Sequence, residues 1–220
     1  MTGAGAEAAA RAVIFDMDGV LVDSGAHHRD AWRLLLGDIG VTPPAEYWRL
    51  TIGRTAEEAV PLILGRPVDA PEVAELAQRK RELYTRLAAR GTRPVGGASA
   101  FIETLARQKV PRAVATSASR HDAETLLAEV GLRRHFDIVI TAEDVRWGKP
   151  NPEVYLKAAA GLAVPSRACL VFEDSLVGVH AARNCGMRVI GLTTSHTGRE
   201  LLTAGAERAI ADFEGFAWPV

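Results

Sequence analysis

Short, wholly apolar segments recur along the chain, and most of them are followed at once by polar residues. Continuous apolar runs of this length are typical of strands that are buried on both faces of a parallel sheet. The pattern therefore predicts a largely parallel sheet. Its strands are expected at residues 12–15, 113–115, 138–140, 169–172 and 189–192, with a weaker sixth candidate at 208–211.

Helical patterns separate these predicted strands. Asn151 followed by Pro152 is typical of a helix start, with the asparagine as N-cap and the proline in the first turn. Strands that alternate with helices imply right-handed crossovers, so we expect an α/β fold with a doubly wound, Rossmann-like parallel sheet. The helices of this layer are expected at residues 98–108, 120–130, 152–161, 176–185 and 198–204.

One long stretch, residues 25–93, breaks the alternation because it contains no convincing strand. Its apolar positions recur at helical spacing and predict helices at 28–40, 55–64 and 71–90. We interpret the stretch as an inserted α-helical cap domain, with residues 94–97 as the returning hinge. The α/β core domain then comprises residues 11–24 and 94–220. The Gly- and Ala-rich residues 1–10 are expected to form a flexible leader.

Chemically active side chains follow the first four predicted strands. The carboxyl ends of parallel strands meet at one edge of an open α/β sheet, so these side chains should lie close together. In chain order they are Asp16 and Asp18, then Ser117, then Lys149, and finally Glu173 and Asp174.

This set suits phosphoryl transfer. Carboxylates hold a hard divalent cation, which neutralises the charge of a phosphoryl group. One aspartate can attack phosphorus and form an acyl phosphate, while a second can protonate the leaving oxygen and later activate water. A lysine and a hydroxyl can hold the remaining phosphoryl oxygens.

Each residue alone also has an ordinary structural explanation. Asp16 and Asp18 could form a turn, and Ser117 could cap the helix that begins near residue 120. Lys149 could be a solvated surface charge, and Glu173 with Asp174 could cap the next helix. Their occurrence at four successive strand ends favours the functional interpretation.

The segment VIFDMDGVLVDS at residues 13–24 resembles the first motif of the haloacid dehalogenase superfamily. Ser117, Lys149 and the Glu173-Asp174 pair resemble its second, third and fourth motifs, in order, and the likeness covers essentially the whole chain. Within the superfamily the chain is similar to the β-phosphoglucomutase-like phosphatases and mutases, which carry a helical cap.

This resemblance implies roles for the motif residues. Asp16 is expected to be the nucleophile and Asp18 the general acid and base, which argues for transfer from and to oxygen. Magnesium is the expected cofactor. Its ligands would be Asp16, the backbone carbonyl of Asp18 and Asp174, with Glu173 close by as a further candidate ligand. Ser117, Ala118 and Lys149 are expected to bind the phosphoryl group.

The cap carries three candidate substrate-binding residues, His28, Arg54 and Lys80. His28 resembles a residue of the mutases that approaches Asp18, and Lys80 aligns with a lysine that contacts substrate. Both could instead be solvated helix residues. Trp32 is expected in the core of the cap. The phosphate-binding arginine of the mutases aligns better with Ala56 than with Arg54.

The missing arginine match favours a phosphatase that hydrolyses a small phosphorylated metabolite, such as a sugar phosphate. A sugar phosphomutase is the alternative, because it shares all four motifs. A non-catalytic protein on the same fold is a third hypothesis, and the complete set Asp16, Asp18, Lys149 and Asp174 argues against it.

The charge and cysteine content limits the partners. Lysine and arginine total 26 and aspartate and glutamate 27, so the net charge of −1 offers no field that would collect nucleic acid or an anionic membrane. No apolar run approaches a membrane span. The two cysteines, Cys169 and Cys185, have no metal-binding spacing and are expected to be buried free thiols, which suits a reducing cytoplasm. A monomer is the expected state.

Overall fold

In the computed structural model, which describes residues 10–219, six parallel strands form one sheet in the order β3-β2-β1-β4-β5-β6. The α/β fold with a doubly wound parallel sheet is thereby confirmed. The predicted leader lies outside the described residues except for Ala10, which is buried. The strands are β1 (Ala12–Phe15), β2 (Arg112–Ala115), β3 (Ile138–Ile140), β4 (Cys169–Glu173), β5 (Arg188–Leu192) and β6 (Arg208–Ile210).

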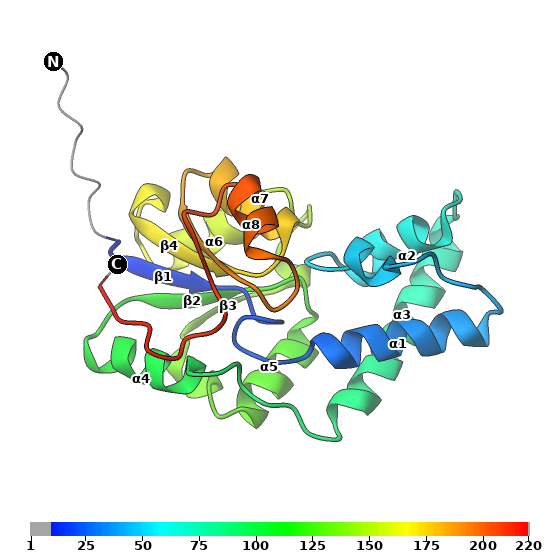
Figure 1. Cartoon of the computed structure of the whole chain (residues 1–220), viewed down its shortest axis with the longest axis horizontal. Coiled ribbons are helices and arrows are strands. Elements are labelled where there is room, and N and C mark those ends of the chain that lie inside the picture. Colours follow the sequence, from blue (N-terminus) through cyan, green and yellow to red (C-terminus); the bar gives the residue numbers. More distant parts are fainter. Residues whose placement is uncertain (1–9, 220) are drawn as a thin grey trace, which may run out of the picture.

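Side chains of β1 alternate between two apolar cores, one on each face of the sheet. Val13 and Phe15 pack with residues of α4 and α5, whereas Ala12 and Ile14 pack with residues of α6, α7 and α8. Figure 1 shows these two helical layers on opposite sides of the strands. The helices are α4 (Ala98–Arg107), α5 (Arg120–Glu129), α6 (Glu153–Gly161), α7 (Leu176–Asn184) and α8 (Gly198–Ala204).

The helices between β1 and α4 have a third apolar core of their own. It contains Trp32, Leu35, Ile63 and Leu76, so Trp32 lies in the core of this helical group as expected. The group stands beyond the carboxyl end of β1 (Figure 1). Its members are α1 (Gly25–Asp38), the 3-10 helix η1 (Tyr47–Leu50), α2 (Ala56–Leu64) and α3 (Ala70–Ala88).

The two segments that connect this helical group to the sheet run side by side. Val22 pairs with Pro94 in an antiparallel bridge, and the Asp23 amide donates to the Arg93 carbonyl at 2.8 Å. The returning segment is also tied to the C-terminal part of the chain, because the Phe213 amide donates to the Gly96 carbonyl at 2.9 Å. The place where the insertion begins and ends is therefore fixed by backbone hydrogen bonds.

Four predicted helix starts need correction. Helices α2 and α3 begin at Ala56 and Ala70, each one residue from its predicted start. Helix α1 begins at Gly25 rather than at residue 28. Its N-cap residue Ser24 donates its hydroxyl hydrogen to Asp18 and makes no side-chain capping bond, so no capping pattern marked this start. Helix α6 begins at Glu153, one residue later than predicted. Asn151 Oδ1 still accepts a hydrogen bond from the Glu153 amide at 3.0 Å.

The cysteine expectation holds only in part. Both thiols are free, but Cys185 lies just after the end of α7 and is partly exposed, unlike the buried Cys169. Within residues 10–219 no helix combines the length and the apolar character that crossing a membrane requires.

Candidate active site

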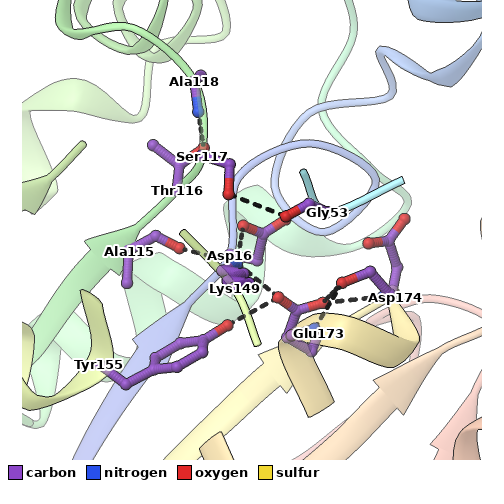
Figure 2. Close-up of polar contacts among 12 residues, drawn as sticks. Asp16, Gly53, Ala115, Thr116, Ser117, Ala118, Lys149, Tyr155, Glu173 and Asp174 are labelled. Carbon is purple, nitrogen blue, oxygen red and sulfur yellow. Dashed lines mark hydrogen bonds and ion pairs between the residues drawn. The ribbon is translucent and has the colours of Figure 1, made fainter. Parts of the chain in front are cut away.

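Lys149 lies at the centre of a buried polar cluster at the carboxyl edge of the sheet (Figure 2). Its Nζ donates to Asp16 Oδ1 at 2.7 Å and to Glu173 Oε1 at 2.6 Å. All three side chains are almost inaccessible to solvent, with Lys149 at 2% exposure. The lysine is therefore not a solvated surface charge, and it connects the loop after β3 to the ends of β1 and β4.

Glu173 is saturated with hydrogen bonds. Its Oε1 accepts from Lys149 and from the Tyr155 hydroxyl at 2.7 Å. Its Oε2 accepts from both the amide and the hydroxyl of Ser175, each at 2.8 Å. A carboxylate with this many donors is well placed to hold Lys149.

Asp174 points to the other side of the strand end, toward the loop after β1. Its Oδ2 accepts hydrogen bonds from Thr194 at 3.3 Å and from Ser195, which both follow β5. Gly19, with φ at +73°, passes so close to Asp174 that a Cβ at this position would overlap the carboxylate. The glycine is required here by both the backbone conformation and the close approach.

The acids of this cluster differ in protonation behaviour. Burial raises the pKa of Asp16 to about 7 although Lys149 opposes the shift, and burial raises the pKa of Asp174 well above its usual range. Burial would also raise the pKa of Glu173, but the charge and hydrogen bond of Lys149 lower it. Lys149 remains charged, because Asp16 and Glu173 raise its pKa against the effect of burial.

These residues fit a divalent cation. Asp16, Glu173 and Asp174 each offer a carboxylate oxygen, and the three atoms lie within 4.8 Å of one another. One lysine faces these three buried carboxylates, so ionisation of all three leaves an excess of negative charge in a poorly solvated place. Oxygen ligands with such a charge excess are what magnesium prefers.

Ser117 and Ala118 lie on the loop after β2, beside the cluster. Ser117 Oγ donates to the Gly53 carbonyl at 2.9 Å, so the cap-side loop reaches the predicted phosphoryl-binding hydroxyl. The Ala118 amide donates to Thr116 Oγ1 at 3.1 Å. The helix that follows is capped by Ser119, not by Ser117, which leaves the Ser117 hydroxyl free of that structural role.

Asp18 turns away from the cluster and toward the helical group. Its Oδ1 accepts from Ser24 Oγ at 2.5 Å and from Tyr84 at 3.2 Å, and it lies 3.1 Å from His28 Nε2. Burial would raise the pKa of Asp18, but His28, Ser24 and Lys80 lower it to about 2. His28 is therefore placed beside Asp18, as the resemblance implies.

Lys80 is buried behind His28, with Nζ 2.8 Å from His28 Nδ1. The possibility that it is a solvated helix lysine is wrong. Burial lowers the pKa of Lys80 to about 8, opposed by Asp18. Arg54 differs, because within residues 10–219 its guanidinium has only one hydrogen bond, to the Leu50 carbonyl at 3.1 Å.

A cavity of about 820 Å³ joins these parts. Asp16, Asp18, Ser117, Ala118 and Asp174 line it from the sheet, and Arg54, Ala56 and Lys80 line it from the helical group between β1 and α4. Lys149 and Glu173 lie behind this surface. Apart from that pair, every predicted site residue lines one cavity.

Several contact residues escaped the sequence interpretation. Thr194 and Ser195 follow the fifth strand, and the strand-end rule would have found them had it been applied there. Tyr155 is a fully buried tyrosine on α6, next to Val154 and close to three alanines, and a buried tyrosine usually has a hydrogen-bond partner for its hydroxyl. Ser24 and Tyr84 gave no comparable signal.

Comparisons with known proteins identify the family of the chain. The chain matches the model of the haloacid dehalogenase-like hydrolases over residues 10–186. It is 35% identical over 217 residues to validoxylamine A 7'-phosphate phosphatase from Streptomyces hygroscopicus subsp. limoneus, covering 95% of this chain and 97% of that protein. It is 31% identical over 197 residues to a phosphorylated carbohydrates phosphatase from Thermotoga maritima, with coverages of 89% and 91%.

A solved β-phosphoglucomutase from Clostridium difficile superposes with a TM-score of 0.84 at 24% identity, covering 95% of this chain and 94% of that one. This likeness concerns the fold alone. Family match, relatives and site geometry lead to one conclusion: the chain belongs to the haloacid dehalogenase-like hydrolases and falls among their phosphatases.

Proposed function

We propose that the protein is a magnesium-dependent phosphatase that hydrolyses a small phosphorylated metabolite, a sugar or polyol phosphate, through an aspartyl-phosphate intermediate. The observation that carries the proposal is the position of Asp16 and Asp18 on one cavity of about 820 Å³, with Lys149 Nζ fixed 2.7 Å from Asp16 Oδ1. A nucleophile, a proton-transfer group and a buried cation therefore converge where a phosphoryl group fits.

In the first step, the Asp16 carboxylate attacks phosphorus and the bond between phosphorus and the ester oxygen breaks. Asp18 gives its proton to that oxygen, so the leaving group departs as a neutral alcohol. Asp18 is ionised in the unliganded protein, since its pKa is about 2. A phosphate dianion beside it raises this pKa, because a nearby like charge disfavours the carboxylate.

In the second step, water attacks the phosphorus of the Asp16 acyl phosphate. Asp18, now ionised, takes one proton from the water, and the bond between phosphorus and the Asp16 oxygen breaks. Inorganic phosphate leaves, and both carboxyl groups are ready for another turnover. Lys149 stays beside Asp16 throughout and stabilises the charge on the phosphoryl oxygens.

Magnesium would be held by Asp16, Asp174 and the backbone carbonyl of Asp18, and when bound it neutralises phosphoryl charge. Glu173 belongs to the same acidic cluster and would in addition orient Lys149. Its four hydrogen bonds support this second role. Ser117 would bind a phosphoryl oxygen once its hydroxyl leaves the Gly53 carbonyl.

The substrate class rests on the cavity and on the relatives. A volume of about 820 Å³ leaves room for a sugar-sized leaving group beside the phosphate. Trp32, Trp48 and Trp147 line it together with several charged side chains, a mixture that suits a hydroxylated ring. The activities for which the two relatives are named, on validoxylamine A 7'-phosphate and on phosphorylated carbohydrates, support the same class.

The function is tested by measuring phosphate release from sugar phosphates, phosphoglycolate and nucleotides in the presence of magnesium. We expect release from at least one sugar phosphate and its loss in an excess of chelator. Magnesium should restore activity, whereas calcium should restore little because its looser coordination disfavours in-line attack. Full activity after exhaustive chelation would contradict the metal requirement.

Magnesium should also stabilise the fold, and more so at high pH. Folding raises the pKa of Asp16 to about 7 and that of Asp174 in the same direction. The folded state therefore binds more protons, so the free energy of unfolding without metal falls as the pH rises from about 4 to 7. The cation compensates the carboxylates that ionise over this range.

Thermal unfolding at pH 5 and pH 8, with chelator or with magnesium, measures this effect. At pH 8, magnesium at about 100 times its dissociation constant should raise the melting temperature by roughly 5 °C or more. The increase should be smaller at pH 5, and Asp174→Asn should reduce it at pH 8. An equal increase at both pH values would argue against binding by these carboxylates.

A sugar phosphomutase is the second candidate, because Lys80 and His28 are paired in the cap and the fold matches a β-phosphoglucomutase. A mutase must also hold the phosphate already present on the sugar. Ala56, at the expected arginine position, offers no charge, and Arg54, two residues away in the chain, is one of the cations on the cavity wall. We therefore expect hydrolysis to exceed isomerisation.

Incubation with β-glucose 1-phosphate, with and without a sugar bisphosphate, measures both products. Free phosphate should accumulate faster than glucose 6-phosphate. Fast formation of glucose 6-phosphate with little free phosphate would instead establish the mutase. In that case Arg54→Ala should convert it into a slow phosphatase, because the second phosphate would lose its cationic partner.

A further inference from the structure

Among the described residues, all hydrogen bonds to the Asp18 carboxylate fall on one of its two oxygens. Oδ1 accepts from Ser24 at 2.5 Å and from Tyr84 at 3.2 Å, and His28 Nε2 lies 3.1 Å away. Within residues 10–219, Oδ2 has no hydrogen-bond partner, and the Asp18 side chain lines the cavity. The two oxygens of this carboxylate are therefore not equivalent.

The proton on the His28 ring follows from its other neighbour. Lys80 Nζ lies 2.8 Å from His28 Nδ1, and a lysine ammonium can only donate. Nδ1 must then accept, which places the ring proton on Nε2, the atom that faces Asp18 Oδ1. Ser24, His28 and Tyr84 thus all present hydrogens to the same oxygen.

Tyr84 is the most deeply fixed cap-side member of this set. It lies on α3 and is 3% exposed, its ring stacks on His28 with centroids 4.1 Å apart, and Lys80 Nζ lies 4.8 Å from its ring centroid. Its hydroxyl donates to Asp18 Oδ1 at 3.2 Å, and a phenol keeps its proton at neutral pH. It therefore remains a hydrogen-bond donor to Asp18.

We infer that Tyr84 is a positioning residue for the general acid and base, and that the transferred proton is carried by Asp18 Oδ2. Three donors hold Oδ1 and leave it no place for a proton. The acid form of Asp18 therefore carries its proton on Oδ2, the oxygen without a partner, and gives it to the leaving oxygen. In the second step the same oxygen accepts a proton from water.

The inference rests on the proposed function. A positioning role for Tyr84 can be distinguished by experiment from a purely structural one. Loss of a positioning residue should harm only steps that need proton transfer. An alkyl phosphate needs protonation of its leaving oxygen, whereas 4-nitrophenyl phosphate has a leaving group that departs as a stable anion. Loss of packing or of cap closure would slow both substrates alike.

The test compares Tyr84→Phe with the unaltered protein on a sugar phosphate and on 4-nitrophenyl phosphate, with magnesium present. We expect kcat for the sugar phosphate to fall by about 10- to 100-fold, since a hydrogen bond to a charged group is lost. For 4-nitrophenyl phosphate the fall should stay below about 3-fold. Asp18→Asn should give the same contrast with larger effects.

Tyr47→Phe is the matched control, because it removes the hydroxyl of another cap-side tyrosine, which bonds the Arg29 carbonyl at 3.0 Å and does not line the cavity. It should leave both rates unchanged. If Tyr84→Phe does not fold, Ser24→Ala removes another Oδ1 donor and enters the same comparison.

Equal losses on both substrates, or no loss on either, would overturn the role of Tyr84 while phosphate release by the unaltered protein upholds the phosphatase. Absence of phosphate release from every substrate by the unaltered protein would instead overturn the proposed function, and the role of Tyr84 with it.

Discussion

Asp16→Asn is expected to abolish phosphate release, with a fall in kcat of roughly 10⁴-fold or more, as is common when a nucleophile is removed. The amide is nearly the same size as the carboxylate but cannot form the acyl phosphate. Its oxygen can still accept the Lys149 hydrogen bond at Oδ1, so the buried cluster should persist. Phosphate release and acid-quenched incorporation of labelled phosphate measure the effect.

The comparison variant is Asp18→Ala, which should still incorporate label on Asp16 but should turn it over slowly. Thermal unfolding of both variants separates lost chemistry from lost structure. Labelled phosphate on Asp18, or substantial phosphate release by Asp16→Asn, would show that the two aspartates have been assigned wrongly. The second result would also support a non-catalytic interpretation of the four motifs.

Lys149→Met is expected to remove activity and to destabilise the protein strongly. Lys149 is the cation that compensates buried Asp16 and Glu173, at 2.7 and 2.6 Å. Removal of one partner from a buried ion pair leaves an uncompensated charge and typically costs about 3–5 kcal/mol. The free energy of unfolding in chelator at pH 7, from urea denaturation, measures this loss.

Lys157→Met is the matched control. Lys157 lies on α6 and pairs with Glu153 at 2.9 Å, but its side chain is 46% exposed. A solvated pair contributes little, so the change in unfolding free energy should stay below about 1 kcal/mol and activity should be retained. Similar losses of unfolding free energy in the two variants would show that the contribution of Lys149 to stability does not depend on its burial.

The sheet and the core motifs were predictable because their signals are local. Each strand is a short apolar run, and the residue that follows a strand lies at the carboxyl edge of the sheet. Asp16 follows β1 and Asp174 follows β4, and these strands pair directly in the sheet. The rule about strand ends therefore brings residues that are distant in the chain together on the basis of their sequence positions alone.

The surroundings of Asp18 could not be predicted in this way. Tyr84 lies 66 positions from Asp18 along the chain, and it approaches only because α3 packs against α1 and the connecting segments pair. Lys80 looked like one of a run of charged helix residues. Its burial depends on which face of α3 turns toward His28 and Trp32, and helical spacing alone did not settle that.

The pairing of the two connecting segments has a consequence for how such proteins can be rebuilt. Asp23 and Arg93 are joined by a backbone hydrogen bond, so the insertion starts and finishes at neighbouring points on the sheet. The entropic cost of closing a chain between two adjacent points rises only slowly with the length of the loop. Helical segments of other sizes could therefore be exchanged at this junction in chimeras while β1 and α4 keep their places, provided that donors equivalent to His28 and Tyr84 still reach Asp18.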